Sequence, residues 1–256
     1  MNEDEIVEIQ FIGKYTPPNY FEEPIIIKKE TFELTISNGE ILAKIEPFFF
    51  FRHPDIEKEL ISLIESNFYA TQIICHRDFN LTKLSRRDLK RDGTQNVSLV
   101  LKPIVIKQLP QSIELVIKDK DGNVVSDPKQ KRLDRQKQLS QKIRKHSDDK
   151  TLKQMLNSYT RAVKNPNHEL VHLYEIRDTL STKFGSQQKA LDKLKNLNTI
   201  WRRLGHLANN ASIKEGRHPG KALGNLRHAT KEELELARNC ALKLIEGYLD
   251  FLENNS

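Results

Sequence analysis

The sequence predicts an α+β fold, in which an N-terminal mixed or antiparallel sheet with one helix precedes a C-terminal all-α bundle. Alternation of apolar and polar residues, which is typical of strands, is found only before about residue 128. After that point the apolar residues recur at helical spacing. We therefore expect two domains, a strand-rich α+β domain over residues 1–127 and a basic helical bundle over residues 128–256.

The first elements are a hairpin and a helix. Residues 31–45 alternate apolar and polar side chains around Asn38 and Gly39, and this dipeptide supplies the positive φ angles of a two-residue hairpin turn. The spacing then changes to a helical stripe, which predicts an amphipathic helix over residues 54–69. The stripe consists of Ile56, Leu60, Leu63, Ile64 and Phe68.

Further strands are predicted at residues 71–75, 97–106 and 112–117, where β-branched and other apolar residues cluster. Residues 83–93 contain five basic side chains and no apolar alternation, so we expect a surface loop or a short helix there.

The second half predicts a series of helices. The last is marked by Thr230 and Glu233, which form a capping box ahead of a long apolar stripe. The expected helices cover residues 131–146, 147–164, 167–184, 186–196, 199–210 and 230–252.

Composition excludes several classes of protein. No apolar run approaches the roughly 20 residues that a membrane-spanning helix needs, and the acidic start does not resemble a signal peptide. Cys75 and Cys240 are the only cysteines and lack the spacing of a zinc or disulfide framework. We therefore expect a cytoplasmic protein that does not act at a membrane.

Charge is distributed unevenly along the chain. Residues 1–50 carry 4 basic and 10 acidic side chains, so the net charge of +7 places +13 on residues 51–256. The excess is greatest over residues 129–164, where 12 lysines and arginines meet three aspartates. Such a surface attracts polyanions, although a well-solvated helix face is the alternative explanation for the helix at 131–146.

Residues 213–228 are the clearest candidate for a binding site, because they space three glycines among cationic side chains. Glycine lets a backbone approach a ligand closely, and guanidinium, ammonium and imidazole groups are suitable donors to phosphate. Alternatively, these cations pair with acidic residues or cap helix C-termini. The expected phosphate-binding residues are Arg202, Arg203, Arg217, Lys221, Arg227 and His228.

His168, Glu169 and His172 match the HExxH pattern, in which two histidines bind zinc and the glutamate polarises a metal-bound water. These residues resemble the zincin metallopeptidase signature. Glu175 and Asp178 stand where one zincin group has its glycine and its further ligand, and helical geometry turns Asp178 roughly 80° away from His168. A zinc peptidase is therefore an alternative function, and zinc is the only cofactor that the sequence suggests.

The helical half also resembles the HEPN class of small helical domains, through residues 201–210 and the Arg217-His218 pair that follows them. This resemblance implies a helical bundle that acts on RNA, and it also implies a homodimer. The RNase motif of the class, an arginine followed by a histidine, is matched only by Arg161 and His168, with Pro166 between them. We carry over no catalytic residue from this motif.

The sequence therefore predicts a nucleic-acid-binding protein, with RNA favoured over DNA and an RNase-like effector as one form of it. In RNA cleavage, an imidazole would act as general acid or base beside a guanidinium that stabilises the developing charge. His206 and His218 are the candidate catalytic residues for this reaction. A non-enzymatic protein-interaction or regulatory module is the remaining alternative.

Overall fold

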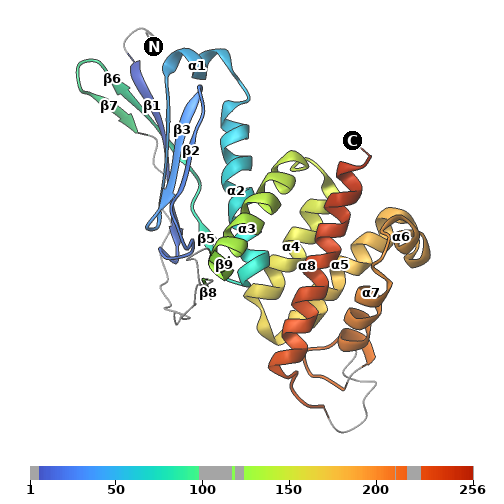
Figure 1. The fold of residues 1–256 in the computed structure, drawn as a ribbon. Helices are drawn as coiled ribbons and strands as arrows, with labels where there is room; N and C mark the ends of the chain where they lie inside the picture. The colour runs from blue at the N-terminus through green and yellow to red at the C-terminus, as the bar shows by residue number, and fades with distance from the viewer. Residues whose placement is uncertain (1–5, 98–116, 119–123, 211, 218–225, 256) are drawn as a thin grey trace. The chain divides into compact units, whose positions relative to one another are not determined.

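The computed structural model describes residues 6–97, 117–118, 124–210, 212–217 and 226–255 (Figure 1). Two compact units are present. One comprises Met1–Ile64 and Phe79–Leu115, and the other comprises Glu65–Asp78 and Val116–Ser256. Residues 65–78, which the sequence analysis grouped with the strand-rich domain, are thus grouped with the helices.

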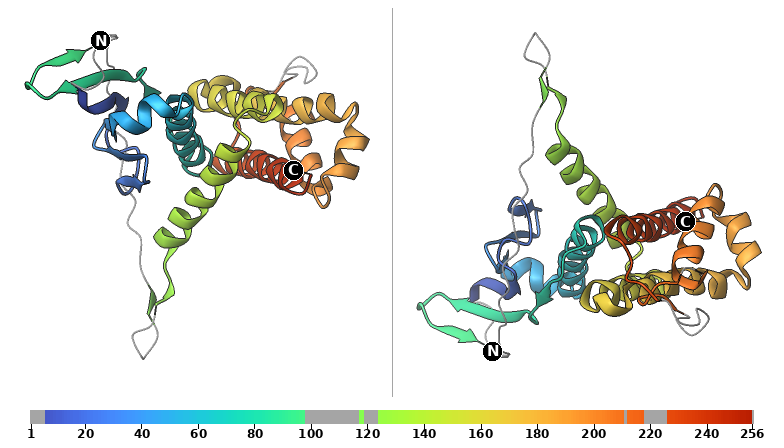
Figure 2. Two further views of the ribbon diagram at one scale, coloured as in Figure 1. Left: turned by 90° about the horizontal axis from the view of Figure 1, so that it is seen from above. Right: turned by 90° about the horizontal axis from the view of Figure 1, so that it is seen from below.

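The first unit contains an antiparallel sheet of seven strands, which confirms the predicted α+β class together with the helices of the second unit. Its strand order is β2-β3-β4-β1-β6-β7, with β5 paired to β1. Figure 2 shows β6 and β7 as a hairpin. The strands are β1 (Ile6–Thr16), β2 (Ile25–Lys28), β3 (Phe32–Ser37), β4 (Glu40–Ile45), β5 (Asn80–Leu81), β6 (Ser85–Lys90) and β7 (Gln95–Val97).

The predicted hairpin at residues 31–45 is confirmed as β3 and β4. Ser37 pairs with Glu40 across a two-residue turn in which Asn38 and Gly39 have φ angles of 51° and 84°. Alternate residues of both strands are buried, so the alternation in the sequence marks the core face of the sheet.

Three predictions in the first half differ from the structure or lie outside the described part. Residues 71–75 are not a strand but the last turns of α2 (Ile56–Cys75), because Ala70 and Ile73 are buried in the core of the helical unit. Of residues 83–93, which were expected to form a loop or a short helix, residues 85–90 are strand β6, because backbone pairing with β1 holds them extended, and residues 91–93 form a turn. Of the strands expected at 97–106 and 112–117, only Val97 in β7 and Ile117 in β8 lie in the described residues.

Short elements complete the first half. They are the helix α1 (Pro47–Arg52), which the sequence analysis did not anticipate, and the paired strands β8 (Ile117–Lys118) and β9 (Val124–Ser126).

The helical unit follows the predicted series closely, and each well-capped helix begins at a residue whose side chain accepts a backbone N–H. Asp127, Asp149, Ser186 and Thr230 are these caps, and Thr230 forms the expected capping box with Glu233. The helices are α3 (Pro128–Lys145), α4 (Lys150–Lys164), the single turn η2 (Pro166–His168), α5 (Glu169–Phe184), α6 (Gln187–Lys193), α7 (Asn198–Gly205), the π-helical segment η3 (His206–Asn210) and α8 (Lys231–Glu253).

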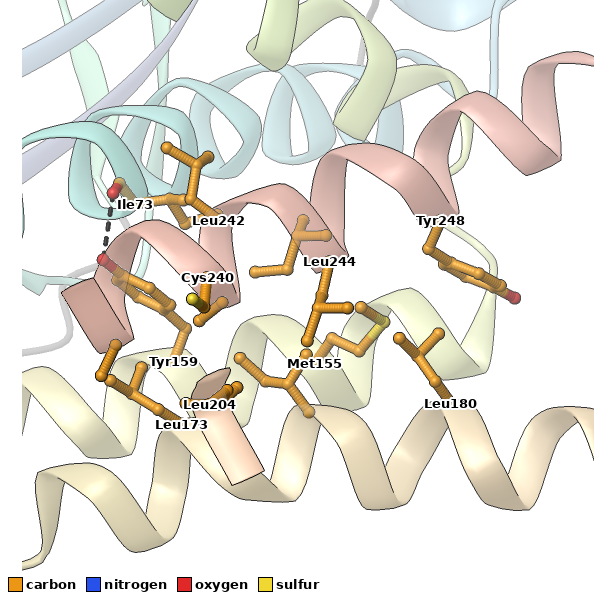
Figure 3. Close-up of a cluster of buried hydrophobic side chains, with 14 of the residues drawn as sticks. Ile73, Met155, Tyr159, Leu173, Leu180, Leu204, Cys240, Leu242, Leu244 and Tyr248 are labelled. Atoms are coloured by element: carbon orange, nitrogen blue, oxygen red, sulfur yellow. Dashed lines mark hydrogen bonds between the residues drawn. The ribbon is translucent and has the colours of Figure 1, made fainter. Parts of the chain in front are cut away.

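One apolar core holds the helical unit together. Helices α4, α5 and α8 lie side by side around it, and α7 packs on α8 (Figure 1). Figure 3 shows Tyr159, Leu173 and Leu244 among the side chains of this core, where the Tyr159 hydroxyl donates to the carbonyl of Ile73 at 3.0 Å. The apolar stripes of the sequence are therefore used for packing, and the polar groups around α7 remain to be explained.

Candidate anion-binding site

The two ends of the glycine-spaced segment lie side by side. Ile213 is buried and pairs in parallel with Arg227, with Lys214 N–H donating to the Arg227 carbonyl at 3.0 Å. The Arg227 N–H in turn donates to the carbonyl of Ser212 at 3.1 Å. Residues 218–225 lie outside the described part of the chain, so His218 and Lys221 stay predictions.

Three described cationic side chains of this segment, those of Arg217, Arg227 and His228, are paired with carboxylates. Arg217 contacts Asp178 at 2.9 Å, and the His228 ring contacts Glu215 at 2.7 Å. Arg227 donates to both oxygens of Glu233, and this pairing lowers the pKa of that carboxyl to about 2. A phosphate at these positions would have to compete with the carboxylates, as expected for the alternative in which the cations pair with acidic residues.

A pocket beside this segment contains a different set of groups. It lies between α5, α6 and the junction of α7 with η3, and its volume is about 390 Å³. Arg202, one of the expected phosphate-binding residues, and His206, one of the two candidate catalytic residues, line it, whereas Arg203 does not. The residues that line it, here named the Arg177 pocket, are Tyr174, Arg177, Gln187, Trp201, Arg202, Gly205, His206 and Asn209.

Arg177 is the central group of this pocket and is only 7% exposed. Its guanidinium carbon lies 4.7 Å from the centroid of the Tyr174 ring and 4.9 Å from that of Trp201. One hydrogen bond, from Nη2 to the Gln187 side chain at 3.3 Å, is made to a neutral group. Within the described residues no carboxylate forms an ion pair with Arg177.

The polar groups around Arg177 are incompletely hydrogen-bonded. Among the described residues, Nε of Arg177, Nε1 of Trp201 and Oδ1 of Asn209 are buried without a partner. Buried polar groups usually have partners, so three unpartnered atoms in residues of one pocket are unusual. Burial lowers the pKa of Arg177, an effect that Tyr174 and Asp178 partly offset, but a guanidinium remains charged at neutral pH.

The local backbone makes room for this side chain. A Cβ on Gly205 would lie 1.8 Å from Nη1 of Arg177, so only glycine allows the guanidinium to occupy its position. The π-helical segment begins at the next residue, and it places both His206 and Asn209 on the pocket. Single π-helical turns are often found at functional sites.

The HExxH residues form a structural cluster instead of an open metal site. Glu169 is 1% exposed and accepts from Nε and Nη2 of Arg238 at 2.6 and 2.9 Å, with the His76 ring at 3.5 Å. His172 contacts Glu175, and His168 precedes the first turn of α5. In the described part of the chain no three His, Cys, Asp or Glu side chains are grouped so that they could hold a metal.

His76, whose ring lies 3.5 Å from Glu169, belongs to the same buried cluster of side chains. The pKa of His76 is lowered to about 3 by burial and by the charge of Arg238. Arg161, which with His168 fits the HEPN spacing, donates to Glu175 at 2.7 Å. These side chains therefore join α4, α5 and α8 to the end of α2.

Comparison of the chain with protein-family models, with curated proteins and with solved structures gives no match. The resemblances to HEPN domains and to zincins therefore remain predictions. None of the described helices combines the length and the apolar character required to cross a bilayer.

Proposed function

We propose that this protein binds RNA through its phosphate groups and that the Arg177 pocket is the principal point of contact. The observation that supports the proposal most directly is the nearly buried guanidinium of Arg177, which has no carboxylate partner among the described residues. Burial of an unpaired charge is costly, and an anion that enters the pocket would offset this cost. Arg202 and His206, at the same pocket, add two further donors.

The charge of the helical unit favours a polyanion over a small anion. Lys131 and Lys137 on α3 are exposed and form no ion pair with any described residue. Such cations attract nucleic acid by releasing its condensed counterions, independently of sequence.

The arrangement favours contact with phosphates over contact with bases. Trp201 is 1% exposed and Arg177 lies against its ring, so a nucleobase has no access to that ring for stacking. Phosphate contacts position a nucleic acid without reading its sequence. We therefore propose binding that depends little on sequence.

Binding of a labelled oligoribonucleotide at several salt concentrations tests this function. We expect affinity to fall steeply with salt, and Arg202→Gln to weaken binding by about tenfold, which is the scale of one charge-assisted hydrogen bond. Arg203→Gln is the matched control, because Arg203 is the next residue of α7 and does not line the pocket. Equal losses in both variants would remove the pocket from the mechanism, and an oligodeoxyribonucleotide of the same sequence tests the preference for RNA.

RNA cleavage by His206 and His218 remains a prediction of the sequence, as do the homodimer and the cytoplasmic location. His206 is well placed for a role at a phosphate because it lines the Arg177 pocket. Shortening of a labelled RNA in the presence of EDTA, lost in His206→Ala, tests the reaction. A protein that binds neither RNA nor DNA would favour the protein-interaction module.

A further inference from the structure

The Arg177 pocket contains a guanidinium group on a nearly buried side chain, and this burial favours one class of phosphate over another. We infer that the pocket takes a terminal phosphate monoester, carried by the end of an RNA chain or by a nucleoside monophosphate, in preference to an internal phosphodiester. This inference rests on the proposed RNA-binding function and adds the class of phosphate to it.

Access is the first argument for a terminal group. Arg177 is only 7% exposed and its guanidinium lies against the rings of Tyr174 and Trp201, so this side chain is recessed. An internal phosphodiester carries a ribose on both sides, and both must follow the phosphate into any recess. A terminal phosphate carries one ribose and presents three free oxygens, so it can reach a recessed donor.

Size agrees with this argument. The cavity volume of about 390 Å³ lies near the lower end of the roughly 300–1,000 Å³ found for small-ligand sites. A single nucleotide end can be accommodated in a pocket of this volume. The pocket is bounded by α5 with Tyr174, by α6 with Gln187 and by α7 with Trp201.

Charge is the second argument. A phosphate monoester carries about −1.5 to −2 charges at neutral pH, whereas an internal phosphodiester carries about −1. The pocket presents the guanidinium groups of Arg177 and Arg202 and the imidazole of His206. No aspartate or glutamate is among the described residues that line the pocket, and the carboxylate of Asp178, the neighbour of Arg177 in the chain, contacts Arg217 at 2.9 Å. The electrostatic contribution to binding is therefore larger for a terminal phosphate monoester than for an internal phosphodiester.

The unpartnered donors make the third argument. The Nε atom of Arg177 and the Nε1 atom of Trp201 are buried without a hydrogen bond in residues that line the same pocket. A bound dianion places a strong acceptor next to these donors, which lowers the cost of their burial. Gly205 keeps this arrangement possible, because any side chain there would displace the guanidinium.

The test compares three oligoribonucleotides of one sequence, with a 5′-phosphate, with a 3′-phosphate or with hydroxyl groups at both ends. We expect one of the phosphorylated forms to bind about tenfold more tightly than the hydroxyl form, as one charge-assisted contact would predict. Arg202→Gln should remove this preference. Gly205→Ala should do the same by displacing Arg177, and Arg203→Gln should retain it.

Competition with adenosine monophosphate and with inorganic phosphate separates the two sources of the terminal group. Displacement of phosphorylated RNA by the mononucleotide would assign the pocket to free nucleotides, and failure to displace it would assign the pocket to RNA ends. Equal affinity for all three oligonucleotides would overturn the inference and leave RNA binding intact. No binding of any oligonucleotide would overturn the proposed function as well.

Discussion

Arg177 and Gly205 depend on each other although they lie on different helices. The guanidinium fills the space that a Cβ at residue 205 would need, so the glycine and the arginine form one structural unit. The sequence contains no sign of this pairing, because Arg177 resembles any charged residue of an amphipathic helix. The only available signal was Gly205 itself, since glycine is unfavourable inside a helix unless packing requires it.

Glu169 is the residue whose role changes most between sequence and structure. As part of HExxH it would polarise a metal-bound water, but its carboxylate is buried and held by two nitrogen atoms of Arg238. A metal-site base and a buried partner of an arginine can both be a glutamate ahead of an apolar helix face, so the motif alone cannot distinguish these two roles. The distinction depends on Arg238, which lies 69 residues away in the sequence.

We predict that Glu169→Gln lowers the free energy of unfolding by about 3 kcal/mol, because Arg238 loses a buried charged partner. Urea unfolding of both proteins measures this difference. Glu175→Gln is the control, since its pairing with Arg161 is solvent-exposed and should contribute about 1 kcal/mol or less. Unchanged stability in Glu169→Gln, together with zinc that co-purifies with the protein and is lost in His172→Ala, would instead support the peptidase.

At the N-terminus of α8, a cation that was expected to bind phosphate, Arg227, instead pairs with a carboxylate of the helix. Glu233 closes the capping box with Thr230 and also receives both guanidinium nitrogens of Arg227. The basic segment is therefore joined to the start of the helix. Arg227 therefore anchors the start of α8, whereas Arg177 has no carboxylate partner among the described residues.

This arrangement predicts a pH-dependent stability. Hydrogen bonds from Arg227 and from the Thr230 N–H lower the pKa of Glu233 from 4.5 to about 2. A lowered carboxyl pKa stabilises the folded state above the unfolded-state pKa, and this contribution is lost as the pH falls from about 4.5 towards 2. We expect the Tm of the wild type to fall towards that of Glu233→Gln over this range, and parallel Tm curves in thermal unfolding would contradict the prediction.

Elements with strong local signals were predictable, and elements held by distant partners were not. The Asn38-Gly39 turn and the Thr230 capping box were correct to the residue, because backbone geometry and capping hydrogen bonds are local. Strand β6 carries charges where a strand usually carries apolar residues, and pairing with β1 and β7 on its two sides keeps it extended. The end of α2 was mistaken for a strand because its apolar run is short enough to fit either element.

At the scale of the whole molecule, the basic residues of α3 include two contrasting sets. Arg135, Lys142 and Lys145 pair with acidic residues of α8, whereas Lys131 and Lys137 have no ion pair within the described residues. The net charge of the sequence does not indicate which of these cations form ion pairs. The second set is available for long-range attraction, whereas the charges of the first set are offset by acidic partners.

We predict that replacing Lys131 and Lys137 with glutamine reduces the slope of log affinity against log salt by about 1 to 2, as expected for the loss of one or two phosphate contacts. Titrations of labelled RNA over a series of salt concentrations measure this slope. The matched control is Lys142→Gln, because Lys142 already contacts Asp250 at 2.6 Å and should change the slope little. A larger change in the control than in the double variant would contradict this division of the charges.

The course of α2 determines how the chain can be divided for experiments. Ala70 and Ile73 lie in the core of the helical unit, and the Ile73 carbonyl accepts the hydroxyl of Tyr159. A fragment that starts at residue 128 would lack these groups and would expose the apolar surface that they cover. A self-sufficient C-terminal piece must therefore carry residues 65–78 as well, supplied in trans as a peptide or joined by a linker in a rearranged chain.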